Sequence, residues 1–377
     1  MKDSVRLQLI SDRPVGVFLS GGIDSTIITG LVSEQTKSKI KTFSANYDIK
    51  GNKFDADANL AKRTSDYYKT DHTEIEVRGK DARDNIFDVI YSMDEPVSNA
   101  TQIATYILSK HTSEKVKVVL GGDGGDELFG GYERYRMSKI ISDYQKIPMI
   151  LRKTFGNAFI NLVKSKYPNA DKMNLLPNAK RYLSFMAQKE NDVGQILKKE
   201  INDVGITEKF YQENFFAEKM PDFEKQFMWA DARSWLPDES LIRSDKMSMA
   251  FGLEQRVPIL DHRLVELALK IPTKWKIEGK NTKAILKVAM KDYIPEYIIN
   301  QPKRGWTSPA SAWLRNELKQ IAYETLSPNY NPEMKRIFNF DKIKIMLDEH
   351  IEGRVYNMNL LWAIMTFQIW YKKFFSN

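Results

Sequence analysis

Cysteine is absent from all 377 residues of the chain. A disulfide framework, a cysteine-based zinc site, an iron–sulfur cluster and a cysteine nucleophile are therefore excluded within it. A strong charge of one sign is missing too, because 57 Lys and Arg stand against 49 Asp and Glu, for a formal net charge of +8. A charge this small bears on partners and solubility and does not by itself indicate a nucleic-acid binder. Hydrophobic residues make up 42% of the chain, which is enough to bury a core and excludes disorder throughout.

The chain also lacks a long hydrophobic run. Its first six residues contain no apolar segment of the kind that a signal peptide requires, so none is expected. The most apolar late stretch, 360–371, is about 12 residues long, whereas a helix that spans a bilayer needs about 20. We therefore expect 360–371 to form a buried C-terminal helix, and we expect a soluble cytoplasmic protein without membrane contact.

Two regimes follow one another along the chain. From about residue 14 to 130, short apolar runs alternate with helical patterns, which predicts an α/β core with a parallel sheet and right-handed crossovers. From about 138 onward strand signals fade and helical patterns dominate. We expect a core over about 1–137 and a large helical portion over about 138–377. The expected strands are 15–19, 40–45, 73–77 and 115–120, and the expected helices are one from residue 23, then 57–68, 81–93 and 101–110.

A glycine loop, Ser-Gly-Gly-Ile-Asp-Ser at 20–25, lies between the first expected strand and the first helix. Ligands of an open parallel sheet bind at the carboxyl ends of strands, where this loop lies. Gly21 and Gly22 let the backbone approach an anion, and the helix N-terminus offers it free N–H groups. Ser20 and Ser25 add hydroxyl donors. Asp24 would repel a phosphate, unless it holds a Mg²⁺ ion that bridges to the phosphates.

A second glycine loop, 121–132, follows the strand that ends at Leu120. It places Asp123, Asp126 and Glu127 within five residues, where they would repel one another unless a cation or a catalytic task required them. The alternatives are structural: residues of the first loop could merely cap a helix and turn the chain, and the second loop could be an exposed acidic turn. The first loop is neither a Walker A loop nor a G-x-G-x-x-G fingerprint.

These loops carry a resemblance to a known family. The first resembles the pyrophosphate loop of the N-type ATP pyrophosphatases, which cleave ATP between the α and β phosphates and adenylate an oxygen of their substrate. The second resembles the second signature of the asparagine synthetase family, in its synthetase half. The resemblance runs through almost the whole chain and implies one domain over 1–377. Its implied fold is an adenine nucleotide α-hydrolase-like core with a helical C-terminal portion.

The resemblance also implies roles for individual residues. Asp24 and Asp126 would share Mg²⁺–pyrophosphate, and Asp123 would contact the substrate and assist the attack of the amine. Lys283, in a segment 280–287 that resembles the family's Lys-x-x-Leu element, would contact the phosphates and stabilise the charge that develops as the adenylate collapses. ATP binding would further involve Leu19 and Ala45 at the adenine or ribose, Gly121 and Gly122 along the adenylate, and Ser20, Gly21, Gly22, Asp24 and Ser25 of the first loop. Some family members carry Ser in place of Gly121.

Two later segments resemble the family as well. The segment 241–250 resembles its central helix and continues into 252–261, where we expect Asp245, Glu254 and Arg256 to form a buried, paired network. The segment 302–306 resembles a later Pro-Lys-x-Gly-aromatic loop, with Trp306 where Phe is usual.

The implied function is an ATP-dependent amide ligase. ATP would adenylate a carboxylate, most favourably the side chain of aspartate, and ammonia would then displace AMP to give the amide. The alternative acceptors are carboxylates whose activation closes a β-lactam ring or leads to the amidation of a sugar or a peptide. They stay open because Asn99, in a candidate specificity loop 94–101, stands where the family frequently has an acid. The family's glutaminase half begins with a catalytic cysteine, and this chain has Lys2 and no cysteine. We therefore expect only the synthetase half, supplied with free ammonia or served by a separate glutaminase subunit or domain.

Two other functions share part of this pattern. A tRNA-modifying pyrophosphatase would use the first loop, but thiolation generally needs cysteines and the second loop is not typical of that class. Nucleic acid is therefore not an expected partner. A non-catalytic scaffold or regulator is the other alternative, and the presence of both acidic loops argues against it.

Overall fold

The computed structural model describes residues 1–49, 54–152, 172–186, 189–218, 220, 222–301 and 305–376. A five-stranded parallel sheet forms its core, with strand order β3-β2-β1-β4-β5. The expected α/β fold with a large helical portion is confirmed. The strands are β1 (Val15–Phe18), β2 (Lys41–Tyr47), β3 (Asp71–Val77), β4 (Val118–Leu120) and β5 (Glu254–Arg256).

The sheet places the two glycine loops side by side. β1 and β4 are neighbours although about a hundred residues separate them, with Val17 paired to Leu120. Both strands run in the same direction, so the loops that follow them meet at one edge of the sheet. This adjacency is the physical basis of the site described below.

The fifth strand corrects the expectation that strands end near residue 138. β5 pairs in parallel with β4, with Leu120 opposite Arg256, and so brings a late segment of the chain to the same edge. Its three residues, Glu-Gln-Arg, carry no apolar pattern, because β5 is an edge strand whose position comes from backbone pairing. The proposed boundary near residue 138 stays a prediction.

The buried network expected at Asp245, Glu254 and Arg256 is wrong. Asp245 is exposed, and the Glu254 side chain is 56% exposed beside its partner Arg256. Arg256 also donates to the backbone carbonyls of Gln8 and Ile10, so it fastens the N-terminal helix to β5. Alternating orientation along β5 turns Glu254 and Arg256 away from the cavity, which leaves Gln255 to line it.

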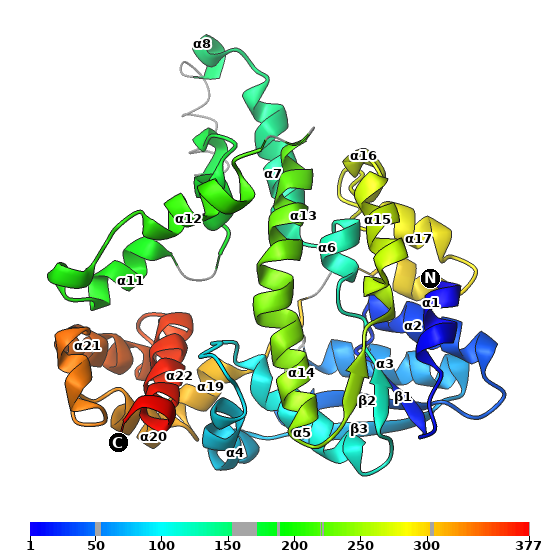
Figure 1. Cartoon of the computed structure of the whole chain (residues 1–377), viewed down its shortest axis with the longest axis horizontal. Helices are drawn as coiled ribbons and strands as arrows, with labels where there is room; N and C mark the ends of the chain where they lie inside the picture. The colour runs from blue at the N-terminus through cyan, green and yellow to red at the C-terminus, as the bar shows by residue number, and fades with distance from the viewer. Residues whose placement is uncertain are drawn as a thin grey trace.

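Helices cover both faces of the sheet. One apolar core joins β2 and β3 to helices α4, α5 and α19 to α22, and a second joins β1, β4 and α2 to helices α15, α17 and α18. Figure 1 shows the C-terminal helices, in orange and red, beside α4 and away from β1. The helices around the sheet are α1 (Lys2–Gln8), α2 (Ile23–Gln35), α3 (Phe54–Tyr68), α4 (Gly79–Tyr91), α5 (Thr101–Ser113), α6 (Gly125–Phe129), α15 (His262–Lys270), α16 (Thr273–Lys276), α17 (Ala284–Ala289), α18 (Glu296–Ile299), α19 (Ala310–Arg315), α20 (Lys319–Thr325), α21 (Phe340–Ile351) and α22 (Met358–Phe375).

The remaining helices extend away from the sheet. Figure 1 shows α13 and α14 as one nearly continuous column through the middle of the molecule, with α7 and α8 toward the top and α11 and α12 above α21 and α22. A π-helical segment, Leu236–Leu241, joins the two column helices. These elements are α7 (Glu133–Gln145), α8 (Met149–Leu151), α10 (Ala179–Leu183), α11 (Glu190–Ile196), α12 (Ile206–Phe215), α13 (Phe223–Arg233) and α14 (Ile242–Met249).

The last helix is buried as predicted. Leu361, Met365 and Ile369 recur every four residues along α22 and are fully covered, so this face packs into the core. Within the described residues, no helix has the length and apolar character that crossing a membrane requires.

Candidate active site

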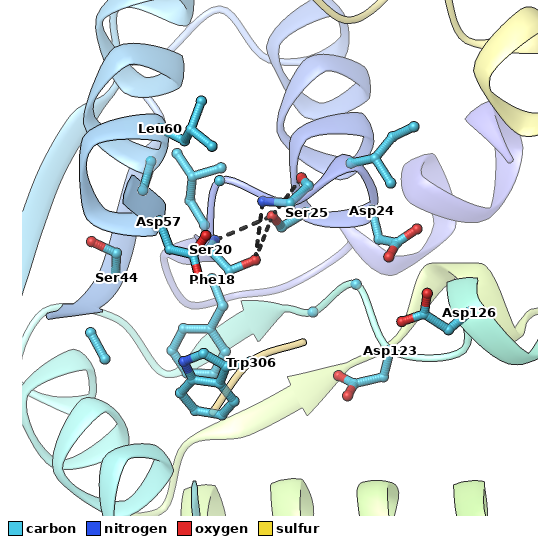
Figure 2. Close-up of a pocket in the computed structure, with 18 of the residues that line it drawn as sticks. Phe18, Ser20, Asp24, Ser25, Ser44, Asp57, Leu60, Asp123, Asp126 and Trp306 are labelled. Carbon is cyan, nitrogen blue, oxygen red and sulfur yellow. Dashed lines mark hydrogen bonds between the residues drawn. The ribbon is translucent and has the colours of Figure 1, made fainter. Parts of the chain in front are cut away.

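A cavity of about 290 Å³ opens at the carboxyl edge of the sheet, and both glycine loops line it. Figure 2 shows Asp24, Asp123 and Asp126 grouped at one side, with Asp57 and Ser44 at the other. Residues from β1, β2, α3, α14, β5 and the start of α17 complete the walls. Segments far apart in the sequence thus converge on one space.

The first loop is held by its own hydroxyl groups. Ser25 Oγ accepts a hydrogen bond from the Ser20 backbone at 3.2 Å and donates to the Gly22 carbonyl at 3.1 Å. Ser20 Oγ lies 3.1 Å from Ser25 Oγ. Gly22 is the N-cap of α2 and no side chain caps that helix, so the capping alternative does not describe this loop. The uncapped N–H groups of α2 are available to an anion.

Gly21 meets two requirements that other residues would not. Its φ of +72° lies in the left-handed region. A Cβ at this position would also lie 2.7 Å from Leu60 Cβ, because α3 passes directly behind the loop. The loop therefore depends on glycine here for backbone conformation and for space.

Lys283 joins the two loops. Its ammonium is ion-paired with Asp24 Oδ2 and lies 2.8 Å from Asp126 Oδ1, and its side chain is only 2% exposed. Burial alone would lower the pKa of Lys283, but the carboxylates of Asp126 and Asp24 outweigh burial and raise it, so the ammonium stays charged. Lys283 has a φ of +55°, an uncommon conformation for a residue with a Cβ and one found at functional sites.

Asp24, Asp126 and Asp123 form an acidic group, and Asp123 lies at the end away from Asp24 (Figure 2). Its Oδ2 accepts a hydrogen bond from Gln255 Nε2 at 2.8 Å, and its Oδ1 accepts one from Ser240 Oγ at 3.3 Å. Burial in the cavity wall raises the pKa of Asp123, and the nearby Arg243 guanidinium opposes part of that rise. A carboxylate with a raised pKa is a better proton acceptor than an exposed one.

Arg243 provides a buried cation at the same end. It lines the cavity and pairs with Glu239 at 2.8 Å, both side chains being largely buried. Glu239 Oε1 also accepts a hydrogen bond of 2.6 Å from Asn99, the residue that stands out in the candidate specificity loop. Asn99 does not line the cavity itself, and its contact with the cavity wall runs through Glu239, which pairs with Arg243.

Sequence reasoning assigned no role to Glu127, which also lines the cavity. Its Oε1 accepts a hydrogen bond from the Tyr132 hydroxyl at 2.7 Å. Burial, and next the charge of Asp126, raise the pKa of Glu127 to about 7. The signal was available, because Glu127 is one of the three acids of the second loop.

The other predicted residues also line this cavity. Leu19, Ser20, Gly21, Gly22, Ser25, Ala45, Gly121 and Gly122 all contribute to its wall. Their individual roles stay predictions. Sequence reasoning missed Ser44, Asp57, Ser240, Arg243 and Gln255, because nothing in their local patterns separates them from ordinary strand or helix residues. Of the segment 302–306, Trp306 lines the cavity, whereas 302–304 lie outside the described residues.

The cavity suits a magnesium ion that arrives with a phosphate ligand. Asp24 Oδ1 is buried and has no hydrogen-bond partner among the described residues, and Asp126 lies beside Asp24 on the same side of the cavity. Among the described residues no three His, Cys, Asp or Glu side chains form a metal cluster. Two carboxylates are nevertheless what Mg²⁺ commonly takes from a protein when phosphates complete its shell. The lining acids also outnumber the cations, with Asp24, Asp57, Asp123, Asp126 and Glu127 facing Lys283, Lys287 and Arg243, so an anionic ligand would need added positive charge.

The chain is similar to known proteins along nearly its whole length. The asparagine synthase family model matches residues 1–372. The chain is 28% identical over 372 residues to the glutamine-hydrolyzing asparagine synthetase 1 of Bacillus subtilis (strain 168), which covers 98% of this chain and 57% of that protein. It is 35% identical over 177 residues to a putative glutamine-hydrolyzing asparagine synthetase 2 of Methanocaldococcus jannaschii, covering 47% of this chain and 32% of that protein. Amidase chry2 of Gibberella zeae is 24% identical over 349 residues, covering 82% of this chain and 51% of that protein. The chain thus spans little more than half the length of the relatives that it matches throughout.

Proposed function

The chain belongs to the asparagine synthase family, and from that premise we propose that it is an ATP-dependent amide ligase. It adenylates a carboxylate, with the side chain of aspartate as the preferred acceptor, and releases pyrophosphate. Ammonia then displaces AMP and forms the amide, which makes asparagine the product. We place this reaction in the cytoplasm, where ATP is supplied.

One observation carries the proposal: Lys283 bridges Asp24 and Asp126, so three distant segments meet beside the uncapped N-terminus of α2. A cation that two carboxylates hold in place can bind the phosphates of ATP while the terminal pyrophosphate leaves. The uncapped N–H groups and Lys283 bind phosphate oxygens, and Asp24 and Asp126 would hold Mg²⁺. The metal would neutralise charge on the departing pyrophosphate.

In the first step, an oxygen of the acceptor carboxylate attacks the α phosphorus of ATP. A P–O bond forms and the bond from the α phosphorus to the bridging oxygen breaks, which releases pyrophosphate and leaves an acyl adenylate. Lys283 stabilises the negative charge that develops on the phosphate oxygens, because its ammonium is held in place before the reaction.

In the second step, the nitrogen of ammonia attacks the acyl carbon. The C–N bond forms, the C–O bond to AMP breaks, and the nitrogen gives up one proton. Asp123 is the acceptor of that proton in this proposal, since burial raises its pKa and it lies at the far end of the acidic group from the nucleotide loop.

Aspartate as the acceptor is supported by the charges at that end. Arg243 is a buried guanidinium on the cavity wall, and it complements the α-carboxylate of an amino acid. Asp123 lines the same cavity, close enough to Arg243 for the guanidinium to oppose the rise of its pKa, and it complements the α-ammonium group. A carboxylate without a second charged group would leave Arg243 without a ligand partner.

Ammonia comes from a separate glutaminase domain or subunit in this proposal. The relatives named glutamine-hydrolyzing are much longer than this chain, and the chain has no cysteine that could attack a glutamine amide. The isolated chain should therefore make AMP with ammonium and not with glutamine. Robust glutamine hydrolysis by the pure chain would contradict this assignment.

The test is exchange of labelled pyrophosphate into ATP, measured with a panel of carboxylic acids that includes aspartate. We expect aspartate-dependent exchange, and its loss in Asp24→Asn and Asp126→Asn. Asp84→Asn, at an exposed site on α4, is the matched control and should keep full exchange. Exchange that requires another acid and not aspartate would reject asparagine synthesis and keep the ligase. Asp24→Asn turnover equal to the parent's would reject the catalytic site itself.

A further inference from the structure

Gln255 is a polar side chain at the acceptor end of the cavity, and the family resemblance gave it no role. It lies in the middle of β5 and is the one residue of that strand that lines the cavity. Its Nε2 donates a hydrogen bond of 2.8 Å to Asp123 Oδ2. This bond is shorter than the 3.3 Å bond from Ser240 to the other carboxylate oxygen, so Gln255 is the principal anchor of Asp123.

The backbone holds Gln255 in a fixed place relative to Asp123. β5 pairs with β4, where Gln255 lies opposite Val119. The Gly121 backbone N–H donates to the Arg256 carbonyl at 2.8 Å, so the pairing continues to the first residue of the second loop. Asp123 and Gln255 thus lie on neighbouring chain segments that backbone hydrogen bonds hold together. The Gln255 amide therefore holds the Asp123 carboxylate from a fixed backbone position.

Gly121 leaves the space that this contact occupies. A Cβ at position 121 would lie 2.6 Å from Gln255 Nε2 and 2.9 Å from Asp123 Oδ2, closer than real Cβ contacts allow. A larger residue at 121 would therefore force the Gln255 amide or the Asp123 carboxylate to move from its place in this hydrogen bond. The three positions form one unit, which we call the acceptor clamp: Gly121, Asp123 and Gln255.

We propose that Gln255 is a positioning residue that aims Asp123 at the incoming nitrogen, and that Gly121 provides the space it needs. This inference rests on the proposed function for the role of Asp123. Gln255 fixes Oδ2, which leaves Oδ1 to take the proton from the nitrogen as the amide forms. The first step, adenylation, uses Lys283 and the first loop, whereas the hydrogen bond that Gln255 donates goes to Asp123.

This division predicts a split between the two half-reactions. Gln255→Ala should lower amide formation about tenfold and change pyrophosphate exchange less than threefold. Adenylate that is not captured by ammonia is hydrolysed, so the ratio of pyrophosphate released to amide formed should rise. A residue with only a structural role would lower both half-reactions together. Glu254→Ala, the neighbouring exposed position on β5, is the matched control and should leave the ratio unchanged.

The space argument is tested by the double variant. Gly121→Ser alone should lower amide formation at least tenfold, because the new side chain meets Gln255. In the Gln255→Ala background the same substitution should cost less than twofold, since the closer of the two contacts, with Gln255, is gone, Asp123 can move slightly, and the new hydroxyl can donate to it. Independent, multiplicative effects of the two substitutions would overturn the clamp.

The outcomes separate this inference from the proposed function. The inference alone would be overturned if the parent exchanges pyrophosphate with aspartate and the Gln255→Ala variant keeps the parental ratio of pyrophosphate released to amide formed. A parent that exchanges with no acid of the panel would overturn the proposed function and with it the role of Gln255. The unfolding free energies of the parent and the three clamp variants, measured in urea, provide a readout without activity: effects at 121 and 255 that simply add would also count against the clamp.

Discussion

Two buried lysines, seven residues apart, have opposite environments in this protein. Lys276 ends α16, and Lys283 precedes α17; both are 2% exposed. Lys283 is paired with Asp24 and Asp126, and its pKa is raised. Burial, and next the charge of Lys225, lower the pKa of Lys276 to about 8. Lys276 has no ion-pair partner in the described parts of the chain, because the nearby Asp222 accepts from the Thr273 hydroxyl and the Lys225 backbone instead.

The difference shows what a buried cation needs in order to serve a reaction. A lysine among apolar side chains tends to lose its proton, so its charge is not reliable. A lysine between two carboxylates keeps its charge and its position, and so can stabilise charge that develops on a substrate. Partners decide whether the charge is functional, since burial is the same for both.

The largest expected effect is on the paired lysine. Lys283→Met should reduce pyrophosphate exchange roughly 10²–10³-fold, or about 2.7–4 kcal/mol of barrier, since a preorganised charge beside the phosphates is removed. The measurement is steady-state exchange with saturating ATP, Mg²⁺ and aspartate. Lys280→Met, at an exposed position three residues earlier, is the control and should keep parental exchange. Parental activity in the Lys283 variant would show that the bridge is structural.

The next effect is on stability at the other lysine. Lys276→Met should raise the free energy of unfolding at pH 7 by about 1–3 kcal/mol, because the folded state no longer buries a protonated amine beside the charge of Lys225. Urea unfolding followed by circular dichroism measures the change. Lys274→Met, exposed on the same helix, should change stability by about 0.5 kcal/mol or less. A destabilised Lys276 variant would mean that the amine has a partner that compensates its burial.

A pH series separates the two lysines further. For Lys276 the unfolded state binds the proton more tightly between pH 8 and 10.5, so its contribution to the free energy of unfolding rises with pH there. The advantage of Lys276→Met over the parent should accordingly shrink from pH 8 to 10. Lys283, whose pKa is raised, contributes stability below its ordinary pKa of 10.5 that is lost only above that value. An advantage of Lys276→Met that stays constant over this range would contradict the lowered pKa.

The smallest effect is expected at a third lysine. Lys287 lines the cavity one turn after Lys283, but its ammonium donates to Asn281 at 2.7 Å and, among the residues that the structure describes, pairs with no carboxylate. Lys287→Gln should raise the KM for ATP about fivefold, or about 1 kcal/mol, and should leave kcat close to the parental value. Initial-rate kinetics over a range of ATP concentrations test this. A fall in kcat as large as that of Lys283→Met would place Lys287 in the reacting charge itself.

The sequence predicted the core of this fold well and its edge poorly. The strands and helices up to residue 130 have apolar runs and helical spacing, and the structure places β1 to β4 and α2 to α5 within a few residues of the expected positions. β5 was missed because three polar residues have no periodic signal. The buried network was assigned to Asp245, Glu254 and Arg256, whereas Arg243 is a charged residue of the same segment that is buried. One position along a helix decides which side is covered, and single-sequence patterns do not resolve it.

The candidate site, too, could be predicted from the sequence only in part. The glycine loops could be recognised because glycine, serine and aspartate at the carboxyl end of a strand are the residue types that bind phosphate and Mg²⁺. Lys283 was selected by resemblance alone, because three lysines in eight residues otherwise predict a solvated helix face. Gln255 had no sequence signal, since its contact with Asp123 spans 132 positions along the chain.

The sequence by itself determined the residue types and their local turns: two strand-to-helix glycine loops, the acids within them, and a chain without thiol chemistry. Only the tertiary structure decided which charges meet. The strand order β1-β4-β5 brings Asp24, Asp123 and Gln255 to one edge, and the chain segment before α17 brings Lys283 between two carboxylates. Local sequence sets backbone conformation through short-range sterics, whereas the partner of a buried charge depends on contacts between segments that are distant in the chain.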